Sequence, residues 1–186
     1  MCGPARLICL LLATAAPASA RADDAALWRA LASGGHVALM RHATAPGVGD
    51  PPGFRLGDCS TQRNLSAAGR EEARAVGERF RRNGVAARKV ATSQWCRARD
   101  TAAEMAIGPV VEEPRVNSFF DAGDRQGPVA ASREAVLEAL TPGPVTVFVT
   151  HQVNVTALTG AYPASGEIVV VRKKGEELEV VGTLKP

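Results

Sequence analysis

Histidine is scarce in this sequence, with three residues in a chain of 186. Aromatic residues are few as well, at 4% of the chain, which argues against the stacking platforms that bind single-stranded nucleic acids. The net charge is only +3, from 22 basic and 19 acidic residues, whereas nucleic-acid binding needs a clear excess of basic side chains. We therefore expect no nucleic acid as a partner.

Cysteine is also scarce, and its spacing is unlike that of a metal site. None of the four cysteines forms a C-x-x-C pair, and none clusters with histidine. Zinc sites need three or four such side chains close together. The sequence therefore predicts no metal centre.

A long apolar run is missing too. The run at residues 7–15 is too short to span a bilayer as a stable helix. Arg6 precedes it, and the small residues ASA follow it at positions 18–20, as in a cleavable leader. Residues 1–20 are therefore predicted to be a signal peptide; the alternative is an N-terminal membrane anchor. We expect an exported protein, periplasmic in a bacterium, with no stable membrane anchor after cleavage.

Export determines how the cysteines are interpreted. Cys2 and Cys9 would leave with the signal peptide, whereas Cys59 and Cys96 would remain in an oxidising compartment. Two interpretations stay open for the remaining pair. The cysteines either form a disulfide that ties two loops together or are two small buried thiols.

Residues 21–186 have the length of a single domain. Apolar periodicity and turn residues predict an alternation of strands and helices. The expected strands are 36–41, 89–92, 110–116, 145–150, 167–172 and 178–184. The expected helices are 24–31, 66–83, 95–105, 129–140 and 153–158. This order predicts a three-layer α/β/α sandwich with a mainly parallel sheet and a C-terminal edge hairpin.

Two of the three histidines follow apolar strands directly. His42 comes after the strand that ends at Arg41, and His151 comes after the strand 145–150. Arg97 lies just past another predicted strand. Because the carboxyl ends of parallel strands meet at one edge of a sheet, we expect these four side chains to share a crevice. Two guanidiniums and two imidazoles there would bind a dianion such as phosphate, helped by nearby helix N-termini.

Histidine is the best candidate for a reacting group in that crevice. Arginine stays protonated and cannot attack, and neither Ser66 nor Thr44 has an evident base beside it. A neutral imidazole attacks phosphorus well when one ring nitrogen is free. The segment 45–58, with three prolines and four glycines, is predicted to be a long loop that forms one wall of the pocket.

Four segments resemble the motifs of the histidine phosphatase superfamily, also called the phosphoglycerate mutase-like family. Residues 39–44 (LMRHAT) resemble its R-H-G motif, and residues 65–73 (LSAAGREEA) its L-[ST]-x-x-G-x-x-[QE]-A helix start. Residues 91–102 (ATSQWCRARDTA) resemble S-S-x-x-x-R-A-x-x-T-A, and residues 149–151 (VTH) resemble V-[ST]-H. One such match would be weak, but the four follow the family's order.

The resemblance implies a role for each matching residue. His42 would take up the phosphoryl group as phosphohistidine, Arg41 and Arg97 would bind its oxygens, and His151 would stabilise the transferring charge. Water would then release phosphate, with no metal and no organic cofactor. The register of the motif favours Arg97 over Arg99 as the second arginine.

Several positions depart from the family pattern, among them Thr44 and Ala45, which stand where the family commonly has an acidic residue. Ala43 replaces the glycine after the nucleophile. Gln152 replaces a glycine after the second histidine, where it would narrow the pocket or donate a hydrogen bond to the substrate. The general acid has no clear match: Asp121, beside Phe119 and Phe120, is preferred over Asp124, and the alternative is that both are turn residues.

These residues predict a metal-independent phosphatase that acts on a small phosphorylated substrate or a phosphoprotein. A mutase is disfavoured because the chain lacks room for the extra segments that grip a mutase substrate. A phosphohistidine-protein phosphatase of a cytoplasmic relay is disfavoured by the export signal. The alternative from another class is a noncatalytic module that binds a phosphorylated ligand.

Overall fold

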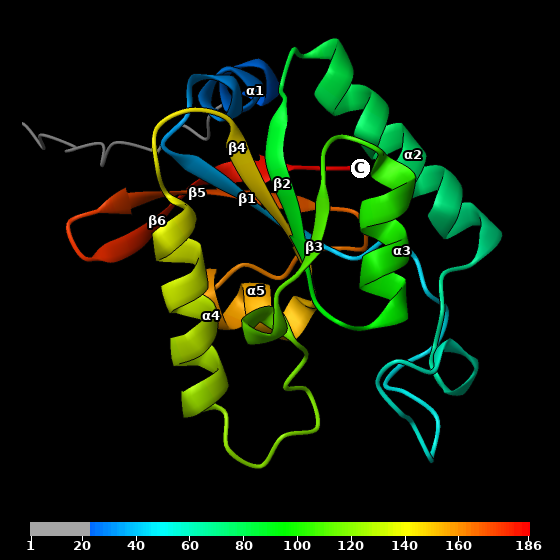
Figure 1. Ribbon diagram of the computed structural model, residues 1–186. Helices are drawn as coiled ribbons and strands as arrows, with labels where there is room; N and C mark the ends of the chain where they lie inside the picture. Colours follow the sequence, from blue (N-terminus) through cyan, green and yellow to red (C-terminus); the bar gives the residue numbers. More distant parts are fainter. Residues whose placement is uncertain (1–22) are drawn as a thin grey trace, which may run out of the picture.

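The computed structural model describes residues 23–186 (Figure 1). The predicted signal peptide, with Cys2 and Cys9, lies outside these described residues. The helices are α1 (Asp24–Ser33), α2 (Ala67–Arg82), α3 (Cys96–Met105), α4 (Gln126–Ala139) and α5 (Gln152–Thr159). The strands are β1 (His36–Arg41), β2 (Ala87–Thr92), β3 (Val110–Glu112), β4 (Val145–Thr150), β5 (Ile168–Lys174) and β6 (Glu177–Leu184). Within residues 23–186, no helix has both the length and the apolarity to cross a membrane.

The six strands form one mixed sheet in the order β3-β2-β4-β1-β5-β6. The first four strands in that order are parallel, and β5 and β6 add an antiparallel hairpin at the β1 side. The predicted parallel sheet and edge hairpin are thus confirmed. Arg41 pairs with Thr150 in the central ladder, and the His42 amide donates to the Thr150 carbonyl at 2.9 Å. This register brings the residues that follow β1 and β4 to the same level.

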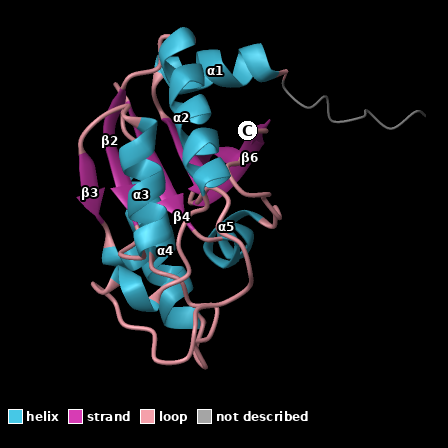
Figure 2. Cartoon of the chain, turned by 90° about the vertical axis from the view of Figure 1, so that its right-hand side faces the viewer, coloured by secondary structure: helices cyan, strands magenta, loops and turns pink. Residues whose placement is uncertain are grey.

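Helices cover both faces of the sheet, as the predicted three-layer sandwich requires. One core packs α1, α2 and α3 against strand residues such as Ala38 and Met40. The other packs α4 and α5 against residues such as Val37 and Leu39. Side chains alternate between the two faces of a strand, so a central strand covered on both sides must be apolar throughout. Figure 2 shows the helices and loops around the sheet.

The start of α2 brings this helix against the residues that follow β1. Ser66 caps the helix, since its Oγ accepts a hydrogen bond from the Gly69 amide at 2.9 Å. A Cβ at Gly69 would collide with the Thr44 carbonyl oxygen, so only glycine permits this close approach. The Glu72 carboxylate accepts from the Thr44 amide at 2.9 Å. The serine, glycine and glutamate of the segment 65–73 therefore hold the backbone just past His42.

Two boundaries differ from the sequence prediction by three residues or more, both near a proline. The strand expected over 110–116 ends at Glu112, and Pro114–Val116 form a 3-10 helix. Proline has no amide hydrogen for the ladder, so the strand cannot continue through Pro114. The helix expected from residue 129 begins at Gln126. Pro128 fits its first turn, where the amide hydrogens have no intrahelical partner.

Candidate active site

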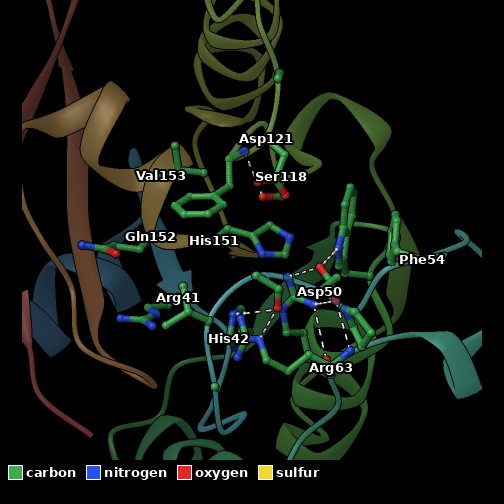
Figure 3. A pocket seen from close by; sticks show the side chains of 18 of the residues that line it. Arg41, His42, Asp50, Phe54, Arg63, Ser118, Asp121, His151, Gln152 and Val153 are labelled. Atoms are coloured by element: carbon green, nitrogen blue, oxygen red, sulfur yellow. Dashed lines mark hydrogen bonds and ion pairs between the residues drawn. The ribbon is translucent and has the colours of Figure 1, made fainter.

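The ends of β1 and β4 bring the two predicted histidines together. The rings of His42 and His151 have centroids 5.4 Å apart and cross at 69°. Both side chains are buried. They lie on the wall of a pocket of about 640 Å³ that Arg41, Arg97 and Gln152 also line. In Figure 3 the two rings lie one above the other, with Arg41 on one side and Asp50 on the other.

The hydrogen bonds of His42 determine which of its nitrogens can react. Nδ1 lies 2.8 Å from the Ala43 carbonyl oxygen. A carbonyl only accepts, so Nδ1 carries the proton. Arg97 Nε donates to Nε2 at 3.2 Å, and Nε2 therefore holds a lone pair. Burial, opposed in part by the Ala43 hydrogen bond, together with the charge of Arg97 lowers the pKa of His42 to about 3. The imidazole is neutral at physiological pH, and its lone pair is on Nε2.

His151 is held from two sides. Its Nε2 lies 2.8 Å from the Ser93 hydroxyl, and its ring meets the Trp95 ring edge to face, with centroids 5.3 Å apart. Burial, followed by repulsion from His42 when both rings are protonated and from Arg97, lowers the pKa of His151 well below its usual range. Both imidazoles of the pair are thus neutral and face a cationic pocket.

Three arginines line the pocket, although the sequence indicated two. Arg41 donates from Nη1 to the Pro163 carbonyl at 3.1 Å, and its Nε is buried without a partner among residues 23–186. Arg97 is buried between His42 and the loop. The third arginine, Arg63, is held by hydrogen bonds to the carbonyls of Gly49, at 2.7 Å, and Ala45. Burial is the main cause that lowers the pKa of Arg41 and of Arg63. A bound dianion would meet all three guanidiniums.

One carboxylate that sequence analysis missed, Asp50, lies among these cations. Its Oδ1 accepts from Arg97 Nη1 at 2.7 Å and from the Arg63 amide at 3.0 Å. Its Oδ2 accepts from Trp95 Nε1 at 2.9 Å and from Arg97 Nη2 at 3.1 Å. Burial raises the pKa of Asp50, but these hydrogen bonds outweigh that effect and the pKa is lowered. Asp50 is therefore ionised.

The loop that carries Asp50 is tied to the start of α3. Cys59 and Cys96 form a disulfide with their Cα atoms 5.7 Å apart, which decides between the disulfide and the free thiols. The Gln62 Oε1 accepts from the Cys96 amide at 2.9 Å. The loop 45–58 forms one wall of the pocket, as predicted. The hydrogen bond to Gln62 occupies the Cys96 amide, at the start of a helix whose N-terminus was expected to help bind phosphate. The N-terminus of α3 therefore offers one backbone donor fewer.

Of the remaining candidate residues, Asp121 lies in the pocket, whereas Asp124 and Arg99 lie outside it. Asp121 lines the pocket and is exposed to solvent; in Figure 3 it lies beyond His151 as seen from His42. Asp124 instead accepts from the Gln126 amide at 2.9 Å and closes the N-terminus of α4. Arg99 pairs with Glu112 at 3.4 Å on the surface, so Arg97 is the arginine of α3 that reaches the pocket.

The described part of the chain offers no cage for a metal ion. Among residues 23–186 no group of three or more histidine, cysteine, aspartate and glutamate side chains is placed to hold one. The charges that face the pocket are mainly guanidiniums, which bind phosphate oxygens in a fixed fork geometry. The arrangement can hold a tetrahedral dianion against a neutral imidazole nitrogen.

Comparison with known proteins agrees with this geometry. The family model of the histidine phosphatase superfamily (branch 1) matches residues 37–141. No curated protein matches the sequence significantly. The fold is similar to that of the protein histidine phosphatase SixA complexed with tungstate, with 19% identity, a TM-score of 0.54 and coverage of 81% of this chain and 97% of that one.

Two further solved structures share the fold. A mycobacterial glucosyl-3-phosphoglycerate phosphatase has 15% identity and a TM-score of 0.53, covering 78% of this chain and 96% of its own. A mutant of phosphoserine phosphatase from Entamoeba histolytica has 12% identity and a TM-score of 0.60, covering 80% and 95%. At these identities the likeness shows the fold. The family match extends over more than half of the chain and supports phosphatase activity in general. The chain belongs to the histidine phosphatase superfamily.

Proposed function

We propose that this protein is a metal-independent phosphatase that hydrolyses phosphomonoesters through a phosphohistidine at His42. The observation that carries the proposal is the tautomer of His42. Nδ1 donates to the Ala43 carbonyl, and the Nε2 lone pair faces a pocket lined by three guanidiniums. Phosphoryl transfer depends mainly on positioning and on stabilising the equatorial oxygens, and these side chains supply both.

In the first step, Nε2 of His42 attacks phosphorus, and the bond from phosphorus to the ester oxygen breaks. Arg41, Arg97 and His151 hold the equatorial oxygens while charge moves to the leaving oxygen. Asp121, at the edge of the pocket, donates a proton to that oxygen. The products of this step are the free alcohol and a phosphohistidine.

In the second step, water replaces the alcohol in the pocket. The Asp121 carboxylate takes a proton from the water as its oxygen attacks phosphorus, and the bond from phosphorus to nitrogen breaks. Phosphate leaves, and the lone pair returns to Nε2 of His42. The cycle therefore returns both side chains to their starting states and consumes one water molecule.

The proposed substrate is a small phosphorylated compound, with a phosphoprotein as the second class. The pocket of about 640 Å³ extends past the guanidiniums, and its walls include Phe54, Trp95 and Phe120. Pockets with apolar walls and a few polar groups are typical of small-molecule sites. We also propose that the protein is periplasmic. The Cys59–Cys96 disulfide supports this location, since disulfides persist in oxidising compartments.

The test is turnover of p-nitrophenyl phosphate by the chain that starts at Arg21, with and without EDTA. We expect turnover in both conditions and a loss of about 10⁴-fold or more in kcat for His42→Ala. His36→Ala is the matched control, because His36 begins the same strand and contacts the Gly34 carbonyl away from the pocket. It should keep kcat within about twofold.

Two results would contradict the proposal. Wild-type protein that binds tungstate tightly but turns over no phosphate ester would indicate a noncatalytic binding module. Turnover that survives in His42→Ala would place the nucleophile elsewhere. Loss of wild-type turnover in EDTA would refute the metal-independent part alone.

A further inference from the structure

Asp50 is a buried anion in a pocket built for anions. Its side chain is only 11% exposed, and the guanidinium of Arg97 that it contacts is 4% exposed. Such a pair is costly to desolvate and stabilises the fold little compared with apolar packing of the same volume. Arg97 contacts both Asp50 and His42, the proposed nucleophile. This position points to a role for Asp50 in the reaction.

Proton transfer is not that role. Each carboxylate oxygen of Asp50 accepts two hydrogen bonds, Oδ1 from Arg97 Nη1 and the Arg63 amide, and Oδ2 from Arg97 Nη2 and Trp95 Nε1. Four donors on two oxygens stabilise the ionised form and leave little room for a proton. A general acid in the same pocket needs a free and reachable oxygen, which the exposed Asp121 has.

The effect of Asp50 on Arg97 is geometric. Arginine offers a fork of Nη1 and Nη2, with Nε on another edge of the plane. Asp50 occupies the fork at 2.7 and 3.1 Å. The edge that remains carries Nε, which points at His42 Nε2 from 3.2 Å. Two bonds to one carboxylate fix the guanidinium plane, and this plane decides where the Nε hydrogen is aimed.

We propose that Asp50 is a positioning residue that locks the Arg97 guanidinium so that its Nε hydrogen, rather than its fork, meets the phosphoryl group beside His42. This inference depends on the phosphatase reaction proposed above. When phosphate enters, the Nε hydrogen bond shifts from the nucleophile to a phosphate oxygen, and the Nε2 lone pair becomes free to attack. Asp50 stays on the fork throughout the reaction.

Three other roles for Asp50 predict different kinetics. A competing anion that must leave before phosphate binds would weaken phosphate binding without supporting catalysis. A general acid would matter only for poor leaving groups, because good ones depart without a proton. A simple counter-charge for Arg63 and Arg97 would be replaced equally well by any carboxylate.

The experiment compares Asp50→Asn and Asp50→Glu with wild type and with the control Asp100→Asn. Asp100 lies on the same helix as Arg97 and pairs with Arg70 at 2.6 Å on the outer face. For each protein kcat and KM are measured with p-nitrophenyl phosphate, a good leaving group, and glycerol phosphate, a poor one. Dissociation constants are measured for vanadate, which resembles the transition state, and for inorganic phosphate. Thermal melting confirms that each variant is folded.

We expect Asp50→Asn to lower kcat for both esters alike, by about 10- to 100-fold, because a catalytic group is misdirected rather than removed. KM should stay within about threefold, and vanadate affinity should fall in parallel with kcat/KM while phosphate affinity holds. Asp50→Glu keeps the negative charge, and thus protects the fold, but moves the carboxylate by one methylene. Its kcat should also fall, whereas Asp100→Asn should match wild type.

Several outcomes would overturn the proposal. These are tighter phosphate binding with unchanged kcat, a loss confined to glycerol phosphate, or full activity in Asp50→Glu. Failure of the phosphatase reaction itself has a separate signature, since wild type and every variant would then lack turnover. Failure of the Asp50 proposal leaves wild-type turnover intact and gives one of the three variant results above.

Discussion

The two halves of the pocket are built in contrasting ways. Arg41 ends β1, and His42 and His151 directly follow the neighbouring parallel strands β1 and β4. The His42 amide continues the ladder of the sheet. The loop 45–58 and Arg63 face these residues from a segment whose only regular element is a short 3-10 helix, Cys59–Thr61. This second half is held by side-chain hydrogen bonds and a disulfide. In Figure 1 it extends well away from the sheet.

The contrast separates two tasks of the site. The strand ends place His42, the proposed nucleophile, and its partner His151, which must keep a fixed distance from each other. The loop half holds the Arg97 guanidinium through Asp50 and carries Arg63 itself. A sheet holds its residues through many shared contacts, whereas the loop depends on a few identifiable ones. Changes in the strand half should therefore affect chemistry most, and changes in the loop half should affect stability and alignment together.

The largest effect among the residues that assist His42 is expected in the strand half, at His151. His151→Ala removes a group that stabilises the equatorial oxygens, and kcat should fall by about 10²- to 10³-fold. Because the side chain is buried, melting of the variant must be recorded beside its kinetics. A folded variant that retains more than a tenth of wild-type kcat would show that this half of the pocket matters less than proposed.

The disulfide tests the loop half. Cys59→Ser together with Cys96→Ser removes a cross-link between positions 37 residues apart. The unfolded chain gains conformational freedom, which should lower the free energy of unfolding by about 3–4 kcal/mol. Denaturant titration measures this cost. Asp50 precedes Cys59 and Arg63 follows it, so the disulfide anchors the segment that carries both residues. Without it kcat should also fall, by about tenfold, at a temperature where the protein stays folded. Unchanged kcat would mean that the loop is aligned without the disulfide.

A smaller and more selective effect is expected at the edge of the pocket. Asp121→Asn should lower kcat for glycerol phosphate by about 10²-fold and leave p-nitrophenyl phosphate nearly unaffected. Asp124→Asn is the matched control, since Asp124 lies outside the pocket and accepts a hydrogen bond from the first amide of α4. The change should affect only stability, by about 1 kcal/mol or less. Equal losses for both esters in Asp121→Asn would contradict its role as general acid.

The smallest effect concerns stability against acid. Burial lowers the pKa of His42 from 6.5 to about 3, so the unfolded chain binds a proton that the folded chain refuses. The contribution of the neutral His42 to the free energy of unfolding is complete above about pH 6.5 and is lost as the pH falls toward 3. Between about pH 7 and pH 5, wild type should lose about 2 kcal/mol more than His42→Gln. Denaturant titrations at the two pH values measure this difference, and equal losses would refute the buried neutral imidazole.

Much of the strand half could be predicted from the sequence. Short β-branched runs that end in Arg41-His42 and in His151 predicted both the strands and the shared crevice. The motif register also separated Arg97 from Arg99. The strand and crevice predictions succeed because periodicity and the geometry of a parallel sheet place residues that are far apart in the chain. The choice of Arg97 rested on the resemblance to the family motif.

The loop half could not be predicted in the same way. Asp50 contacts Arg97 across 47 positions, and no periodic pattern links an aspartate in a loop to a helix that follows so much later. The available signals were the unusual length of the loop and two cysteines, Cys59 just after the loop and Cys96 at the start of α3. They indicated a functional wall but not which side chain would face the cations.

The most direct test of the account is to trap the intermediate. The enzyme is mixed with a phosphate ester, quenched rapidly in base and digested, and the phosphorylated residue is located by mass spectrometry. We predict a phosphoryl group on His42 that is stable in base, labile in acid and absent from His42→Ala. A phosphoryl group on another residue, or none in an enzyme that turns over, would contradict the assignment of His42 as the nucleophile.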